Sequence, residues 1–280
     1  MRNLIELLDI EFYKVKHHKL SKFLIIAYFA LLSSIALIAS IKFKLGNTEI
    51  HLAEQGIFNF PYIWHFNTYI ADIFTFFLAI IIVSMVTNEY SYRTLKQNLI
   101  DGLSKQEFIL SKFALGLGLS AFATLFVFVI SLILGLIYSD FNSPGIIFSQ
   151  IYFLPAFFLK LTGVFSFILF LGILFKRSAF ALGFFFVWMV IEKIFYGLFR
   201  WKFFNDEIAT KLIAFFPYTS FQNLLPQPFT RLNAAKQLGH QIGQDIDKFQ
   251  GLQPIDFLIV VFWILFFYYS SLKILKIRDL

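Results

Sequence analysis

The sequence contains no cysteine among its 280 residues, and only 15% of them are charged. The lack of cysteine excludes disulfides, thiol chemistry and Cys-ligated metal sites. An average soluble domain carries about 25% charged residues, so this chain is poor in the side chains that keep a surface in water. It also lacks a Walker A loop, a His-Glu-x-x-His motif and a Gly-x-Ser-x-Gly motif. We therefore expect no ATP binding by a Walker A route, no metal site and no cofactor.

Apolar side chains make up 59% of the chain, which includes 41 phenylalanines. A soluble core of this size fills long before so many apolar residues are buried, so lipid must solvate much of the surface. The net charge of +7 could suggest nucleic acid. In a membrane protein, however, cytoplasmic lysine and arginine explain a positive charge, and we expect no nucleic-acid partner. The composition predicts an all-α polytopic membrane protein with one transmembrane domain over residues 1–280.

Six stretches are apolar and long enough to cross a bilayer, which takes about 20 residues. Lys176 and Arg177 interrupt the run from Leu161 to Ile191, which as one helix would be about 46 Å long, too long for a core of about 30 Å. We therefore place a hairpin tip at these two residues. Lys160 then lies near the outer end of a span, where it can snorkel to the interface. The predicted spans are residues 23–41, 69–87, 113–138, 155–175, 178–195 and 255–272.

The distribution of lysine and arginine predicts that both ends of the chain are cytoplasmic. With the ends inside, about fourteen Lys and Arg residues are cytoplasmic and three lie outside, apart from a long segment to which the rule does not apply. That segment, residues 196–254, is predicted to be extracytoplasmic. Within it, Ile208–Phe216 could be re-entrant and residues 231–249 could form an amphipathic helix. Asp72 and Glu192 lie at span ends, where charged groups usually mark the interface.

The first 22 residues predict an amphipathic helix in the membrane interface. Apolar residues recur at helical spacing, and charged residues separate them. This helix could be a basic anchor with no other role. Its predicted apolar face is Leu4, Leu7, Leu8, Phe12 and Val15.

Residues 88–112, between the second and third spans, carry two helix signals. Gly102 is placed to end a short helix in the left-handed conformation, and Ser104 with Glu107 has the spacing of a capping box. Glu89 and Arg93 are four residues apart, so on a helix they would share a face and could pair with each other or with a partner. Two capped helices suit a docking surface, although the segment could also be an ordinary interfacial loop.

A stripe of small residues on the third span, Gly116, Ser120 and Thr124, lets helices approach closely. We interpret it as a packing surface within the chain, with a partner subunit as the alternative.

The segment from Asn88 to Lys112 resembles the permease subunit of a type 2, exporter-type ABC transporter. The shared features are an acidic residue at the end of span two (Glu89), a Thr-Leu-x-x-x-Leu-like stretch (Thr94 to Leu99) and a lysine that enters span three (Lys112). Arg93 stands where that family often has glycine, and residues 102–105 replace a turn that usually contains proline. The six-span topology with an amphipathic N-terminal helix is similar as well.

This resemblance implies a dimer of permeases in the bacterial cytoplasmic (inner) membrane, each docked on a separate ATPase subunit that binds the ATP. The residues expected to couple the two subunits are Glu89, Tyr90, Arg93, Thr94, Leu95, Leu99 and Gly102. The alternative is a non-ABC polytopic protein, such as a secondary carrier or an assembly subunit of a membrane complex. A membrane enzyme is disfavoured because no nucleophile–base pair is discernible.

Overall fold

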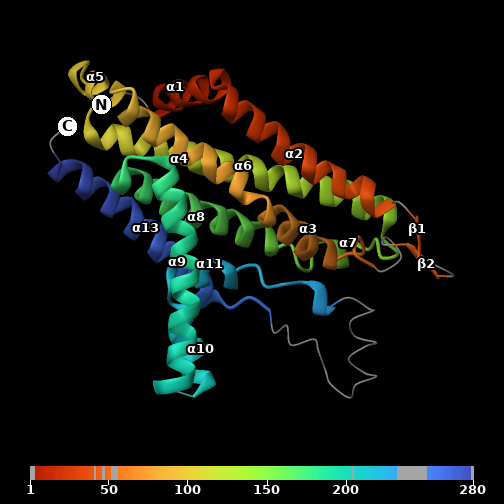
Figure 1. Ribbon diagram of the computed structural model, residues 1–280. Helices are drawn as coiled ribbons and strands as arrows, with labels where there is room; N and C mark the ends of the chain where they lie inside the picture. The colour runs from red at the N-terminus through yellow and green to blue at the C-terminus, as the bar shows by residue number, and fades with distance from the viewer. Residues whose placement is uncertain are drawn as a thin grey trace.

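The computed structural model describes residues 4–40, 42–45, 48–51, 56–203, 205–231 and 251–278. The long helices α2, α4, α6 and α8 run side by side in a bundle, and α9 crosses them and projects from the bundle (Figure 1). The helix α8 lies at its centre and contacts α4, α6, α9 and α13. The described helices that build the bundle are α1 (Leu4–His17), α2 (Lys19–Ser40), α3 (Tyr62–Ile73), α4 (Thr75–Ser91), α5 (Thr94–Ile100), α6 (Lys105–Tyr138), α8 (Phe153–Phe175), α9 (Ser178–Leu198) and α13 (Pro254–Ile277).

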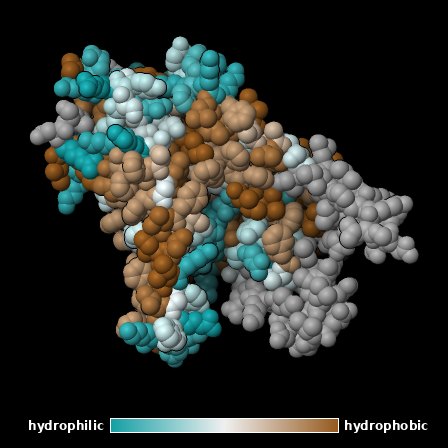
Figure 2. All heavy atoms as spheres, in the orientation of Figure 1, coloured by the Kyte–Doolittle hydropathy of each residue, from teal (hydrophilic) through white to brown (hydrophobic). Residues whose placement is uncertain are grey.

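The helices α1 and α5, the α8–α9 turn and the end of α13 lie together at one end of the bundle, which we call the α5 end (Figure 1). The opposite end carries a short antiparallel hairpin of β1 (Lys42–Leu45) and β2 (Thr48–His51) and the short helix α7 (Pro144–Ile147). Hydrophilic residues gather at the α5 end, and apolar residues cover the helices beyond it (Figure 2). This distribution is typical of helices that leave a polar interface and enter lipid.

Four described helices, α6, α8, α9 and α13, are long and apolar enough to cross a membrane. The pair α3 and α4 makes a fifth candidate, because the two helices are separated by Phe74 and bent by 47°. The helix at the predicted span 69–87 begins earlier, at Tyr62, and breaks at Phe74 before it continues, so the bounds of this span stay a prediction. The first predicted span falls on α2, whose side chains after residue 34 lie outside the described residues, so six crossings stay a prediction.

The α8–α9 turn confirms the break predicted within the long apolar run. The helix α8 ends at Phe175, Lys176 adopts a left-handed conformation with φ of 57°, and α9 begins at Ser178. Arg177 between them is extended. At the same end, the guanidinium of Arg278 donates to the carbonyl oxygens of Ile173 and Leu174, so the end of α13 is tied to the end of α8.

The segment after α9 contains a π-helical turn (Phe199–Phe203), α10 (Asp206–Ala214), α11 (Pro217–Asn223) and a 3-10 turn (Phe229–Arg231). The segment Ile208–Phe216, which could be re-entrant, falls mostly on α10, and its entry into the membrane stays a prediction. The helix α10 carries an exposed Lys211–Glu207 ion pair at 2.6 Å, whereas α11 packs against α8, α9 and α13. Phe221 of α11 fills the space above Gly163, where a Cβ atom would lie 2.7 Å from the ring. The amphipathic helix predicted at 231–249 lies almost wholly outside the described residues.

Buried charges fasten α11 to the bundle, contrary to expectation. Lys160 is fully buried rather than snorkelling, and its ammonium lies 2.7 Å from the Asp72 carboxylate and 3.0 Å from the Gln222 side-chain oxygen. Lys160 is the eighth residue of α8, so the pair lies about 10 Å along the helix from its start. The pair therefore joins the α3–α4 bend to α8 and α11.

Glu192 likewise does not mark an interface. It is 1% exposed, and its carboxylate accepts hydrogen bonds from the backbone N–H groups of Tyr218 at 2.9 Å and Thr219 at 2.7 Å. The Trp188 indole donates to the same carboxylate at 2.6 Å. Glu192 thus satisfies N-terminal donors of α11 that would otherwise be buried without partners.

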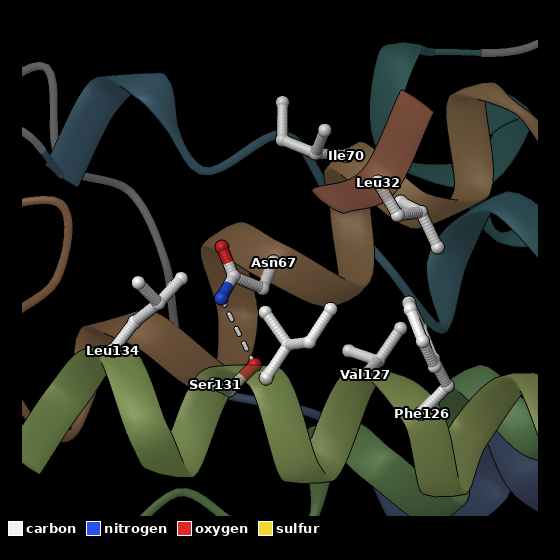
Figure 3. A pocket seen from close by; sticks show the side chains of 8 residues that line it. Leu32, Asn67, Ile70, Phe126, Val127, Ser131 and Leu134 are labelled. Carbon is white, nitrogen blue, oxygen red and sulfur yellow. Dashed lines mark hydrogen bonds between the residues drawn. The ribbon is translucent and has the colours of Figure 1, made fainter. Parts of the chain in front are cut away.

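A small apolar cavity of about 20 Å³ lies between α2, α3 and α6 (Figure 3). The Asn67 side-chain amide points across one side of it and donates to the Ser131 hydroxyl at 2.9 Å. The volume suffices for about one water molecule, which is too little for a substrate. This cavity is therefore a packing gap bridged by a hydrogen bond.

Candidate coupling surface at the α5 end

Two carboxylates and two ammonium groups meet at the α5 end, and we call them the four-charge cluster: Glu11, Lys14, Glu89 and Lys112. The Lys112 ammonium lies 2.7 Å from the Glu11 carboxylate and 3.0 Å from that of Glu89. The Lys14 ammonium lies 2.6 Å from Glu89 and 3.1 Å from Glu11. Each cation thus contacts both anions, and the cluster is formally neutral.

The cluster joins α1, α4 and α6 below the surface. The side chains of Lys112, Glu11 and Glu89 are 1%, 4% and 5% exposed, whereas that of Lys14 is 36% exposed. Burial lowers the pKa of Lys14, but the carboxylates of Glu11 and Glu89 outweigh it, and the pKa lies above its usual value of 10.5. Lys14 is therefore charged at neutral pH. Removing a buried partner from such a cluster leaves an uncompensated charge.

Glu89 also anchors α5. Its second carboxylate oxygen accepts hydrogen bonds from the Thr94 hydroxyl at 2.7 Å and from the Asn98 amide at 3.2 Å. Leu95 adds an apolar anchor, since it is 2% exposed. One carboxylate therefore connects the end of α4 to α5, to α1 and to α6.

Of the two pairings considered for Glu89 and Arg93, the one between the two residues themselves is wrong. The helix α4 ends at Ser91, and Arg93 lies beyond it in a left-handed conformation with φ of 56°. The two residues consequently do not share a helix face, although they are four apart in sequence. Glu89 turns inward to lysines, and Arg93 is exposed.

Both helix signals in the segment are confirmed. The helix α5 ends at Ile100, Gly102 has φ of 93°, and the Leu103 N–H donates to the Asn98 carbonyl at 2.9 Å. Ser104 accepts from the Glu107 N–H at 3.1 Å, and Glu107 accepts from the Ser104 N–H at 2.8 Å, which completes the capping box of α6. The two turns therefore fix α5 across the ends of α4 and α6.

The predicted coupling residues divide into a supporting set and an exposed set. Glu89 and Leu95 are buried, and Tyr90 and Leu99 are half-buried, so these four support α5 from below. Arg93, Thr94 and Gly102 are exposed. Two further residues of this segment, Tyr92 at 75% and Ile100 at 70% exposure, are also exposed, although the sequence did not mark them as coupling residues. The structure thus leaves one face of α5 without a partner among the described residues.

The small-residue stripe of α6 packs inside the chain at two of its three positions. A Cβ atom on Gly116 would lie 3.6 Å from the Cβ of Phe165 and 3.8 Å from Ile82, which are ordinary van der Waals distances, so Gly116 faces α4 and α8 and an alanine would also fit there. Ser120 is fully buried, and Thr124 is half-buried and donates to the Ser120 carbonyl at 2.8 Å. Gly116 and Ser120 are therefore packing residues of this chain.

Sequence reasoning missed Glu11 and Lys14 as members of the site. In α1 the buried face is Leu7, Glu11 and Val15, whereas Phe12, expected on the apolar face, is 64% exposed. The spacing of four residues between these three positions could have revealed a charge on the buried face. Its partners could not be found in this way, because Lys112 lies 101 residues away along the chain.

A family profile described as ABC-2 family transporter protein matches residues 7–192, about two thirds of the chain. The chain belongs to this family. It is therefore an ABC-2 type permease, a multi-pass membrane component of transport that is not itself the catalytic subunit. No curated protein matches the chain in a sequence search.

The family match decides against the alternative of a non-ABC polytopic protein. The matched residues begin within α1, end at Glu192 in α9, and so contain all of the four-charge cluster and α5. The helices α10, α11 and α13 lie beyond the matched region. The four-charge cluster and α5 thus lie within the region that matches the family.

Proposed function

We propose that this permease is the membrane-spanning subunit of an ATP-driven ABC exporter and docks on a separate ATPase subunit through α5. In this proposal the protein lies in the bacterial cytoplasmic membrane, with both termini and α5 in the cytoplasm and a second permease copy beside it. The observation that carries the proposal is that one face of α5 is exposed while Glu89 connects α5 to α1, α4 and α6. The membership of the family implies an ATPase partner.

The contacts of Glu89 explain how a displacement of α5 would be transmitted to the membrane-spanning helices. A helix that only touched its neighbours through apolar contacts could slide, whereas charged hydrogen bonds hold their geometry within a few tenths of an ångström. Glu89 links α5 to α4 and α6, and the capping box starts α6 directly after the α5 turn. Movement of α5 would therefore rotate or shift the start of α6 and the end of α4 together.

The decisive experiment is purification of a tagged chain with its ATPase. We expect the wild type to retain a separate ATPase subunit, and the isolated chain to hydrolyse no ATP. Ile100→Asp should abolish most of this retention, because it replaces an exposed apolar side chain at the end of α5 with a charge. Gln106→Asp, an exposed position at the start of α6, serves as the matched control. Wild-type retention of no ATPase, or ATP hydrolysis by the isolated chain, would overturn the proposal.

The proposed orientation is tested separately, since the chain has no cysteine of its own. Single cysteines at the exposed positions Gln106 and Lys211 can be labelled with a membrane-impermeant thiol reagent in intact cells. We expect labelling at residue 211 and none at residue 106 until the membrane is permeabilised. The reverse pattern would invert the topology and place α5 on the wrong side for an ATPase.

A further inference from the structure

A groove of about 640 Å³ lies beside α5, between the α4–α5 turn and the α8–α9 turn. Four of the residues that line it are cations. Arg93 and Lys96 form one lip, and Lys176 and Arg177 form the other. All four side chains are exposed, so their charges face the space that the groove encloses. Two turns that are about 80 residues apart in sequence thus both contribute positive charges to this groove.

No acidic side chain among the groove-lining residues balances these four cations. Glu89 is the one carboxylate in the lining, and it already contacts the ammonium groups of Lys14 and Lys112. Asp101, at the other end of α5, accepts a hydrogen bond from Gln97. Lys176 lies over the Tyr90 ring, 5.6 Å from its centroid, which positions the ammonium without neutralising it. Among the residues that the structure describes, the lining of the groove therefore carries an excess of positive charge.

The backbone of both lips is held in an unusual conformation. Arg93 and Lys176 have φ of 56° and 57°, and they are the two non-glycine residues with positive φ in the described part of the chain. Glycine would adopt this conformation without the clash that a Cβ atom causes. Residues in such strained conformations often occur at binding sites, where the side chain takes part in binding. Here each lip carries a long cation at the strained position.

We infer that this groove receives an acidic, carboxylate-rich segment of the ATPase subunit. The inference rests on the proposed function, because it concerns the same ATPase partner and a second place at which that partner would contact the permease. Arg93 and Lys96 belong both to the exposed surface of α5 and to the groove, so a partner that covers α5 also covers one lip. Carboxylates placed between the lips would contact cations from both turns. The partner would then clamp α5 to the α8–α9 turn.

The test measures the affinity between the purified permease and the ATPase that co-purifies with it, at low and at high salt. The first variant, Arg93→Gly with Lys176→Gly, removes a cation from each lip and keeps the left-handed turns. The second, Lys96→Gln with Arg177→Gln, removes the other two cations. The matched control, Lys16→Gln with Lys19→Gln, removes two exposed cations at the α5 end that do not line the groove.

We expect each groove variant to bind the ATPase roughly 5- to 30-fold more weakly at low salt, with a flatter salt dependence, because two charge pairs at the rim of an interface are lost. The control should bind as the wild type does. Groove variants that keep both the affinity and the salt dependence would overturn the inference and leave docking on α5 intact. A wild type that retains no ATPase would instead overturn the proposed function. Variants that keep the ATPase but lose co-purifying anionic phospholipid would assign the groove to lipid headgroups and also overturn the inference.

Discussion

The four-charge cluster at the α5 end and the Asp72–Lys160 pair beside α11 both place ionised side chains where little water reaches. In the cluster each cation has two anionic partners, and Lys14 is 36% exposed. In the pair each charge has one opposite partner, with neutral Gln222 as the third member. Lys160 is 1% and Asp72 14% exposed. Each charge of the four-charge cluster thus has two opposite partners, whereas each charge of the Asp72–Lys160 pair has one.

This difference indicates different tasks. A redundant cluster can lose or stretch one contact while every charge keeps a partner, which suits a region that must respond to docking. A single buried pair has no such reserve, because separation of its members would expose two charges to a low-dielectric interior. We therefore expect α5 and its neighbours to shift during function, and the contacts among α3, α8 and α11 to persist.

The largest effect is expected from breaking the Asp72–Lys160 pair. Asp72→Asn leaves the Lys160 ammonium buried without an anion, and such a loss costs about 3–5 kcal/mol of stability. The measurement is the apparent unfolding temperature of the purified protein in detergent. The double variant Asp72→Leu with Lys160→Met should recover most of the loss, because apolar replacement of a buried pair is often neutral. A single variant as stable as the wild type would show that the pair is dispensable.

Removal of either carboxylate from the four-charge cluster should cost less, about 1–3 kcal/mol, because the remaining charges can still pair. Glu89→Gln should cost more than Glu11→Gln, since Glu89 also holds Thr94 and Asn98 of α5. Abundance in the membrane and the unfolding temperature measure both. If Glu89→Gln were instead as stable as the wild type but lost ATPase binding, Glu89 would face the partner, as expected for an exposed residue.

The two ends of α5 provide a matched pair of smaller effects. Gly102→Ala forces a side chain into φ of 93°, although no atom lies within 4 Å of the added Cβ, so the cost of about 1–2 kcal/mol is purely backbone strain. Arg93→Gly relieves the corresponding strain at the other end and should stabilise the turn slightly. Unfolding temperatures in opposite directions would support this account. A shift in the same direction for both variants would contradict it.

The smallest effect is expected for Lys14→Met, less than about 1 kcal/mol, since Lys112 still contacts both carboxylates. Because the pKa of Lys14 is raised, its contribution is fully present below its usual pKa of 10.5 and is lost as the pH rises through the higher value in the folded protein. The stability difference between variant and wild type should therefore stay constant between about pH 6 and 9. A difference that disappears within this range would show that Lys14 titrates there.

Local signals in the sequence were sufficient where neighbouring residues alone decide the structure. The capping box of Ser104 and Glu107, the left-handed stop at Gly102 and the break at Lys176 all depend on contacts within a few residues. The start of α3 at Tyr62 was missed, because hydropathy marks the lipid-facing stretch rather than the helix itself. The Glu89–Arg93 pair failed for a related reason, since helical spacing was assumed beyond the point where α4 ends.

The sequence by itself determined that this chain is a helical membrane protein and where most of its helices turn, because apolar length and capping chemistry are local properties. Only the tertiary structure decided which buried charges meet. Glu11 and Lys112 are 101 residues apart, and Lys160 and Gln222 are 62 apart. Whether such side chains face lipid, an interface or one another depends on the rotation and depth of each helix in the bundle. The assignments of Lys160 and Glu192 changed for that reason, from interface markers to buried contacts between helices.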